Sequence, residues 1–129
     1  MAQVREVTAK LSSELEKVNY IVATTGFLTL KGRDETSEGL DKKLGCNFYA
    51  RFRFIYDLMP LIEKAANNGE ETGVLSVLSA GHGQSVELDD LGLAKRYSLS
   101  KAGGHAVTYN DAMIMVKLFP VVVETLTMW

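Results

Sequence analysis

The sequence places a tyrosine and a lysine where together they could move a proton. Tyr97 and Lys101 stand four residues apart in a helical pattern, so their side chains share one face about one turn apart. An ammonium held near a phenol favours the phenolate and lowers a tyrosine pKa that is normally about 10. The pair therefore predicts a proton donor and acceptor that works near neutral pH. The alternative is a solvent-facing pair at the start of a helix.

A serine stands at the end of a predicted strand upstream of this pair. Residues 74–78 form a short apolar run, which is typical of a buried strand that ends at Ser79. A hydroxyl at that strand end would steady a reacting oxygen beside the tyrosine. If the strand runs short, Ser85 is the alternative serine.

Helical and strand patterns alternate along the chain. Residues 4–18 repeat apolar side chains, Val7 among them, at three- and four-residue steps, which predicts an amphipathic helix with one buried stripe. A β-prone run over residues 20–25 follows and is closed by Gly26. A helix followed at once by a buried strand is typical of an α/β protein with a doubly wound parallel sheet.

Two long helices complete the predicted pattern. The first is expected to begin at an N-cap on Thr36, and Pro60 is expected to kink it or to end its regular part. The second is expected over about residues 95–119 and would carry both Tyr97 and Lys101. The fold class is therefore α/β, a partial Rossmann-like sheet with long helices.

The order of Ser79, Tyr97 and Lys101, with small residues following on the same helix, resembles the short-chain dehydrogenase/reductase family. The segment Tyr-Ser-Leu-Ser-Lys-Ala-Gly at residues 97–103 is its most specific part, and the resemblance extends over most of the chain. It implies a single partial domain over residues 1–129 whose tail, from about residue 120, has diverged. It also implies that Tyr97 is the general acid and base, that Lys101 lowers its pKa and touches the nicotinamide ribose, and that Ser79 holds the substrate oxygen.

The same resemblance assigns three further positions. Asn47 lies on the predicted second helix, where family members have an asparagine that holds a water between the lysine and solvent. Residues 22–26 stand in the place of an Asn-Asn-Ala-Gly element beside the cofactor, and Ala23 and Thr24 replace its asparagines. Gly26 and Ala23 are therefore expected cofactor contacts, together with Tyr97 and Lys101. The alternatives are an Asn47 that points to solvent and a plain strand-end glycine.

The Gly-rich dinucleotide turn of the family does not occur in this sequence. We therefore interpret the chain as the catalytic half of the family's sheet, without the N-terminal dinucleotide-binding unit and the C-terminal substrate segment. The implied function is hydride transfer between NADP or NAD and a ketone or secondary alcohol. The truncation is expected to weaken or abolish binding of this cofactor. The alternative is a catalytically inactive remnant that acts as an interaction or structural protein.

Composition narrows the expected partners. The chain has 129 residues, 47% of them hydrophobic, and a formal net charge of −2, which gives no basic footprint for nucleic acid. Its one cysteine, Cys46, excludes an internal disulfide, and no metal-ligand spacing occurs. No apolar run approaches the roughly 18 residues of a membrane span. We expect a cytoplasmic protein with a small-molecule substrate, and the resemblance implies a homodimer formed through the long helices.

Overall fold

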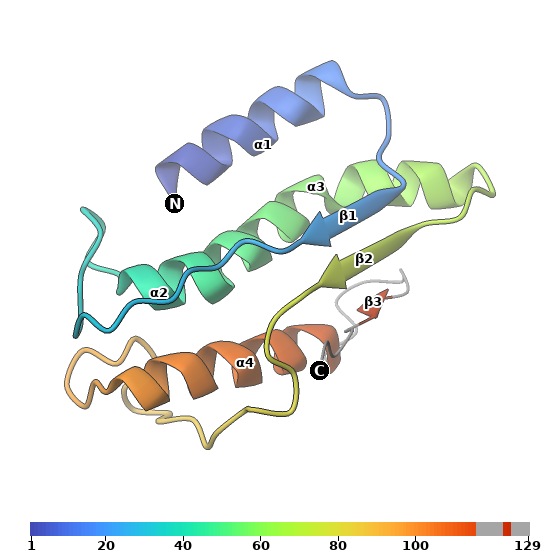
Figure 1. The fold of residues 1–129 in the computed structure, drawn as a ribbon. Helices are drawn as coiled ribbons and strands as arrows, with labels where there is room; N and C mark the ends of the chain where they lie inside the picture. Colours follow the sequence, from blue (N-terminus) through green and yellow to red (C-terminus); the bar gives the residue numbers. More distant parts are fainter. Residues whose placement is uncertain (116–122, 125–129) are drawn as a thin grey trace.

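The computed structural model describes residues 1–115 and 123–124, which form a small parallel sheet with helices packed around it (Figure 1). The strands follow the order β1-β2-β3. Helix α1 packs on α3, α3 packs on β1 and β2, and α4 packs on α2 and η1. In chain order the elements are α1 (Ala2–Glu14), β1 (Tyr20–Ala23), α2 (Lys42–Leu44), η1 (Gly45–Tyr49), α3 (Ala50–Asn67), β2 (Gly73–Ser76), α4 (Leu99–Met115) and β3 (Val123–Glu124). The predicted α/β class is confirmed.

The two central strands run parallel, with Ile21 opposite Val74. Both of these side chains are buried and join the core formed with α3, including Ile55 and Ile62. Each strand is shorter than predicted: β1 ends at Ala23 and β2 ends at Ser76. Because the strands are parallel, the segments that follow them emerge at the same edge of the sheet.

The first long helix begins later than expected. Thr36 is not its N-cap: the helical turns begin at Lys42, and the Asp41 side chain accepts hydrogen bonds from the backbone N–H groups of Lys43 and Leu44. The Asp41 carboxylate also accepts the N–H of Asp34, and the residue is only 1% exposed. Aspartate therefore satisfies the free donors at this helix start from a buried position.

The helical stretch is continuous from Lys42 to Asn67 but is not a regular α-helix throughout. Residues Gly45–Tyr49 form a π-helical segment, η1, between α2 and α3. Helix α3 then continues through Pro60 to Asn67, so the proline does not end it. Pro60 lies on the exposed side, as does Tyr56 four residues earlier, so water can reach the carbonyl that the missing N–H leaves free.

The buried face of α1 differs from the one that the sequence predicted. Val7, expected on the buried face, is 49% exposed, and Thr8 is buried in its place. The Thr8 hydroxyl lies 2.8 Å from Oδ2 of Asp57 on α3, so a polar contact joins the two helices here. The diverged tail expected from about residue 120 falls outside the described residues, apart from the two residues of β3.

The cap at Asp41 gives a testable measure of what starts the long helix. Asp41→Ala removes the acceptor of three hydrogen bonds. It should lower the free energy of unfolding by about 1–2 kcal/mol, the usual cost of a lost N-cap. Asp41→Asn keeps a capping oxygen and should retain most of that stability. Urea unfolding of the three proteins measures the difference, and an unchanged midpoint for Asp41→Ala would contradict the assignment.

Candidate active site

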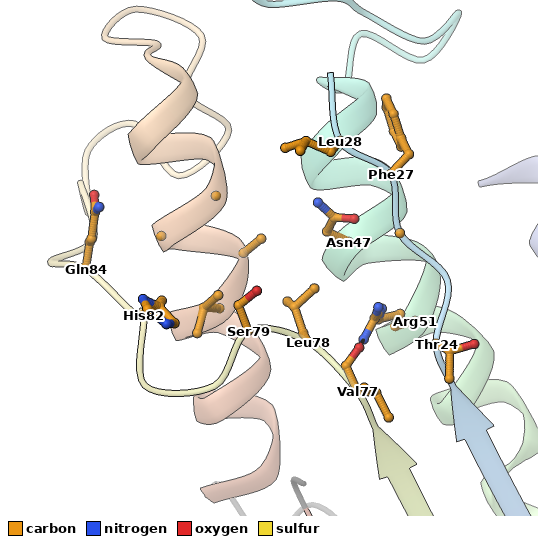
Figure 2. Close-up of a pocket in the computed structure, with 15 residues that line it drawn as sticks. Thr24, Phe27, Leu28, Asn47, Arg51, Val77, Leu78, Ser79, His82 and Gln84 are labelled. Atoms are coloured by element: carbon orange, nitrogen blue, oxygen red, sulfur yellow. Dashed lines mark hydrogen bonds between the residues drawn. The ribbon is translucent and has the colours of Figure 1, made fainter. Parts of the chain in front are cut away.

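A pocket of about 850 Å³ lies at the edge of the sheet where β1 and β2 end (Figure 2). In doubly wound sheets this carboxyl edge is where ligands bind. Figure 2 shows Asn47 and Leu28 on one side of it and Ser79 and His82 on the other, next to α4. The lining residues are Thr24, Gly26, Phe27, Leu28, Asn47, Arg51, Val77, Leu78, Ser79, His82, Gln84, Gly103, Gly104, Ala106 and Val107.

A buried arginine ties the two strand ends together. Arg51 on α3 is 2% exposed, and its Nε and Nη2 both donate to the carbonyl of Thr25, with Nε at 2.9 Å. Its Nη1 donates to the carbonyl of Val77 at 2.7 Å and to Oγ of Ser76 at 3.0 Å. Burial lowers the pKa of the Arg51 guanidinium, an effect partly opposed by the nearby Cys46 thiol. Arg51 therefore fixes the spacing of the segments after β1 and β2.

The network continues to the last helix. The Ser76 hydroxyl donates to Oδ1 of Asn110 on α4 at 3.0 Å. The Asn110 amide in turn donates to the backbone carbonyls of Asn47 at 3.0 Å and Ala106 at 2.8 Å. Asn110 is 2% exposed, and each of these groups is paired. One chain of hydrogen bonds thus connects α3, β2, α4 and η1 beneath the pocket.

Asn47 and Gly26 meet at the pocket. Asn47 lies in η1, and its buried Oδ1 has no hydrogen-bond partner among the residues that the structure describes. A β-carbon at Gly26 would lie 3.0 Å from that oxygen and 3.6 Å from Nη2 of Arg51, so a side chain at this position would crowd Asn47. Ala23, the other expected contact, is not among the lining residues; its carbonyl accepts the N–H of Val77 across the sheet.

The two candidate serines lie in different surroundings. Both serines are exposed, but Ser79, three residues after β2, lines the pocket and Ser85 does not. The segment between them is held on α4: the N–H of Gln84 donates to Oγ1 of Thr108, and a β-carbon at Gly104 would overlap the Gln84 side chain. The geometry therefore favours Ser79 as the pocket hydroxyl.

Tyr97 lies before the helix that was expected to carry it, because α4 begins only at Leu99. Its hydroxyl is buried and has no hydrogen-bond partner in the part of the chain that is described. Its ring packs against the small core cluster that includes Leu44 and Leu93, and Nζ of Lys43 lies 5.3 Å from the ring centroid. Tyr97 is not one of the pocket-lining residues.

Lys101, in the first turn of α4, is paired with an acid. Its Nζ donates to Oε1 of Glu87 at 2.7 Å, and Glu87 also pairs with Arg96 at 3.0 Å. The hydrogen bond from Lys101 holds the pKa of the Glu87 carboxyl below its usual range. The structure therefore brings Ser79, Asn47 and Gly26 to one pocket, and it places Tyr97 and Lys101 outside that lining.

A second carboxylate holds the segment just before Tyr97. Asp90 accepts the backbone N–H groups of Ala94, Lys95 and Arg96. Burial raises the pKa of Asp90, but these donors outweigh it and the net shift is downward. This carboxylate turn is why residues 94–96 do not continue α4 toward the N-terminus.

Comparisons with known proteins bear on the fold and the protein class. No family model matches the sequence. "Oxidoreductase AN1596" of Emericella nidulans is 35% identical over 108 residues, which cover 81% of this chain and 31% of that protein. A short-chain dehydrogenase from Streptomyces avermitilis superposes with a TM-score of 0.58 at 14% identity, covering 98% of this chain and 42% of that one. The chain has the fold of the short-chain dehydrogenases/reductases.

A second solved structure agrees with this. The NADH-dependent reductase A1-R′, complexed with NAD, gives a TM-score of 0.66 at 14% identity and covers 98% of this chain and 51% of that one. The chain thus spans about a third of the curated relative and about half of the solved short-chain dehydrogenase/reductase structures. The resemblance seen in the sequence is confirmed at the level of the fold.

Two further observations concern metal ligands and membrane-spanning helices. Within residues 1–115 and 123–124, no group of three or more histidine, cysteine, aspartate or glutamate side chains is placed to hold a metal ion. Among the helices of the described part, none has the length and apolar character needed to cross a bilayer.

The Glu87–Lys101 pair gives a pH prediction. Because the folded-state pKa of Glu87 is lowered, its stabilising effect is complete above the ordinary carboxyl pKa of about 4.5 and is lost as pH falls through the folded value. Glu87→Gln should therefore show a shallower loss of thermal stability on acidification than the wild type. Glu63→Gln, an exposed site on α3, is the control and should follow the wild-type curve. Identical pH profiles for wild type and Glu87→Gln would contradict the pairing.

Proposed function

We propose that the chain is the catalytic part of an NAD(P)-dependent oxidoreductase that interconverts a ketone and a secondary alcohol. The observation that carries this proposal is the pocket at the carboxyl ends of β1 and β2, with Ser79 and Asn47 in its lining, in a chain with the short-chain dehydrogenase/reductase fold. The similarity to an oxidoreductase and to an NADH-dependent reductase supports the reaction class.

The lining suits the nicotinamide and ribose of such a cofactor. It offers an unpartnered acceptor on Asn47, the Ser79 hydroxyl and apolar walls that include Leu78 and Val107. The one guanidinium in the lining is already bonded to strand carbonyls, so these residues fit the nicotinamide half better than the pyrophosphate. A bound nicotinamide dinucleotide supplies or accepts the hydride.

The chain's own residues would handle the proton and the substrate oxygen. The Ser79 hydroxyl would donate to the carbonyl oxygen and orient it. Tyr97 would give that oxygen a proton in reduction and take it back in oxidation, with Lys101 lowering the tyrosine pKa. In this role Tyr97 must turn toward Ser79, and Lys101 must exchange the Glu87 carboxylate for the phenol.

A second candidate is an inactive chain that acts through its surfaces. It is favoured by the positions of Tyr97 and Lys101 outside the pocket lining and by the edge strand β1, whose Tyr20 and Val22 are 59% and 61% exposed. An apolar strand edge pairs readily with another chain. Cofactor binding separates this candidate from the enzyme.

Cofactor titration is the first test. NADPH or NADH at 100–1,000 times its dissociation constant should raise the free energy of unfolding by about 3–4 kcal/mol if the site binds it. Nicotinamide fluorescence and thermal unfolding of the full chain measure both effects. If neither cofactor changes the fluorescence or the melting temperature, the enzyme proposal fails and the interaction protein is favoured.

Substitution of Tyr97 tests the proton transfer once a reducible ketone has been found. Tyr97→Phe removes only the hydroxyl and should slow reduction by about 10²–10⁴-fold while cofactor binding is retained. Tyr109→Phe is the matched control, because that hydroxyl donates to the Leu91 carbonyl outside the pocket. An active Tyr97→Phe variant would refute the assignment.

The two serines can be compared in the same assay. Ser79→Ala should reduce turnover by at least tenfold, because it removes the hydroxyl proposed to orient the substrate oxygen. Ser85→Ala changes an exposed side chain outside the pocket and should leave turnover unchanged. If Ser85→Ala lost turnover and Ser79→Ala kept it, Ser85 would be the residue that orients the substrate oxygen.

A further inference from the structure

The buried guanidinium of Arg51 lacks an opposite charge among the residues described. Several other cations pair with carboxylates at the surface, as Lys101 does with Glu87 and Arg53 with Asp57. Surface pairs of this kind contribute little, whereas a buried ion is costly unless it is compensated. Arg51, at 2% exposure, is therefore a cation that would gain much from a counter-charge.

All the partners of Arg51 are neutral oxygens. The carbonyls of Thr25 and Val77 and the hydroxyl of Ser76 orient the guanidinium but leave its unit charge uncompensated. These bonds use the Nε–H, both N–H groups of Nη1 and one N–H of Nη2. Because a guanidinium has five N–H groups, one remains on Nη2.

The guanidinium that carries the remaining donor belongs to a residue that lines the pocket. Nη2 is 3.6 Å from the position that a β-carbon on Gly26 would occupy. The residues that line the pocket include no aspartate or glutamate, and Gln84 and Ser79 add uncharged polar groups. An anion that enters this pocket meets the Arg51 guanidinium and no carboxylate in its lining.

We propose that this pocket binds a small carboxylate, with Arg51 as its charge partner. One free N–H and one unit of charge match a monoanionic carboxylate, whereas a phosphate group needs several donors. This carboxylate site rests on the proposed oxidoreductase function. Together they assign the substrate class, a carbonyl or alcohol compound that also carries a carboxylate group. Arg51 is held by the ends of β1 and β2, and these bonds place its guanidinium charge at the inner side of the pocket.

Nicotinate and nicotinamide form a matched pair of probes, because they share a ring and differ in the charge of one substituent. Titration of the ¹⁵N-labelled full chain, followed by NMR, should show nicotinate binding at least tenfold more tightly than nicotinamide. The Arg51 Nε resonance should shift with nicotinate. Equal affinities for the two probes, or no binding of nicotinate at millimolar concentration, would overturn the proposal.

Two variants locate the binding. Arg51→Gln should abolish nicotinate binding, but it also disturbs the strand ends, so Gly26→Ala provides a second test that leaves the arginine in place. A methyl group there narrows the space beside Nη2 and Asn47 and should weaken nicotinate binding at least tenfold. Gly45→Ala in η1, where a β-carbon meets nothing within 4 Å and which does not line the pocket, is the control and should bind as the wild type does. Retained binding in Gly26→Ala would overturn the assignment.

The outcome is separate from that of the cofactor titration. Nicotinate binding that depends on Arg51 without any NADPH or NADH binding would support a carboxylate site and reject the oxidoreductase function. Binding of a cofactor without nicotinate binding would support the oxidoreductase function and reject the carboxylate site.

Discussion

The pocket depends on one buried cation and the main-chain carbonyls that surround it. Arg51 reaches from α3 to the carbonyls of Thr25 and Val77, which lie two residues beyond β1 and one residue beyond β2. Besides the backbone bond from Val77 N–H to the Ala23 carbonyl, this bridge joins the segments after β1 and β2 at the edge of the sheet. Burying a guanidinium is costly, and four hydrogen bonds to fixed acceptors are what make the position tolerable.

The same interaction connects the fold to the chemistry. Through Ser76 and Asn110 the network extends to the backbone of Asn47, so the residue with the unpartnered side-chain oxygen is held by its main chain. The π-helical segment that contains Asn47 is a local departure from regular helix, of a kind that often occurs at functional sites. Ser79, by contrast, lies on an exposed segment that is positioned mainly by the strand end before it.

Sequence patterns predicted the parts that local periodicity determines. The parallel α/β arrangement and the meeting of Ser79, Asn47 and Gly26 followed from short apolar runs and from a family resemblance. Arg51 and Asn110 were missed, because a polar residue in an amphipathic helix ordinarily faces solvent, and the partners on other elements lie 25 or more residues away in sequence. Tyr97 was placed on a helix because the spacing to Lys101 is helical, whereas the turn held by the Asp90 carboxylate delays the helix start.

Hydrogen exchange at the arginine side chains tests the bridge most directly. In ¹⁵N-resolved NMR spectra, the Nε–H of Arg51 should exchange with deuterated solvent about as slowly as the amides of β2, because it is buried and donates to the Thr25 carbonyl. Arg5, on the exposed face of α1, provides the reference for fast exchange. If the Arg51 Nε–H exchanges as fast as that of Arg5, the guanidinium does not join the strands and the pocket has no fixed inner wall.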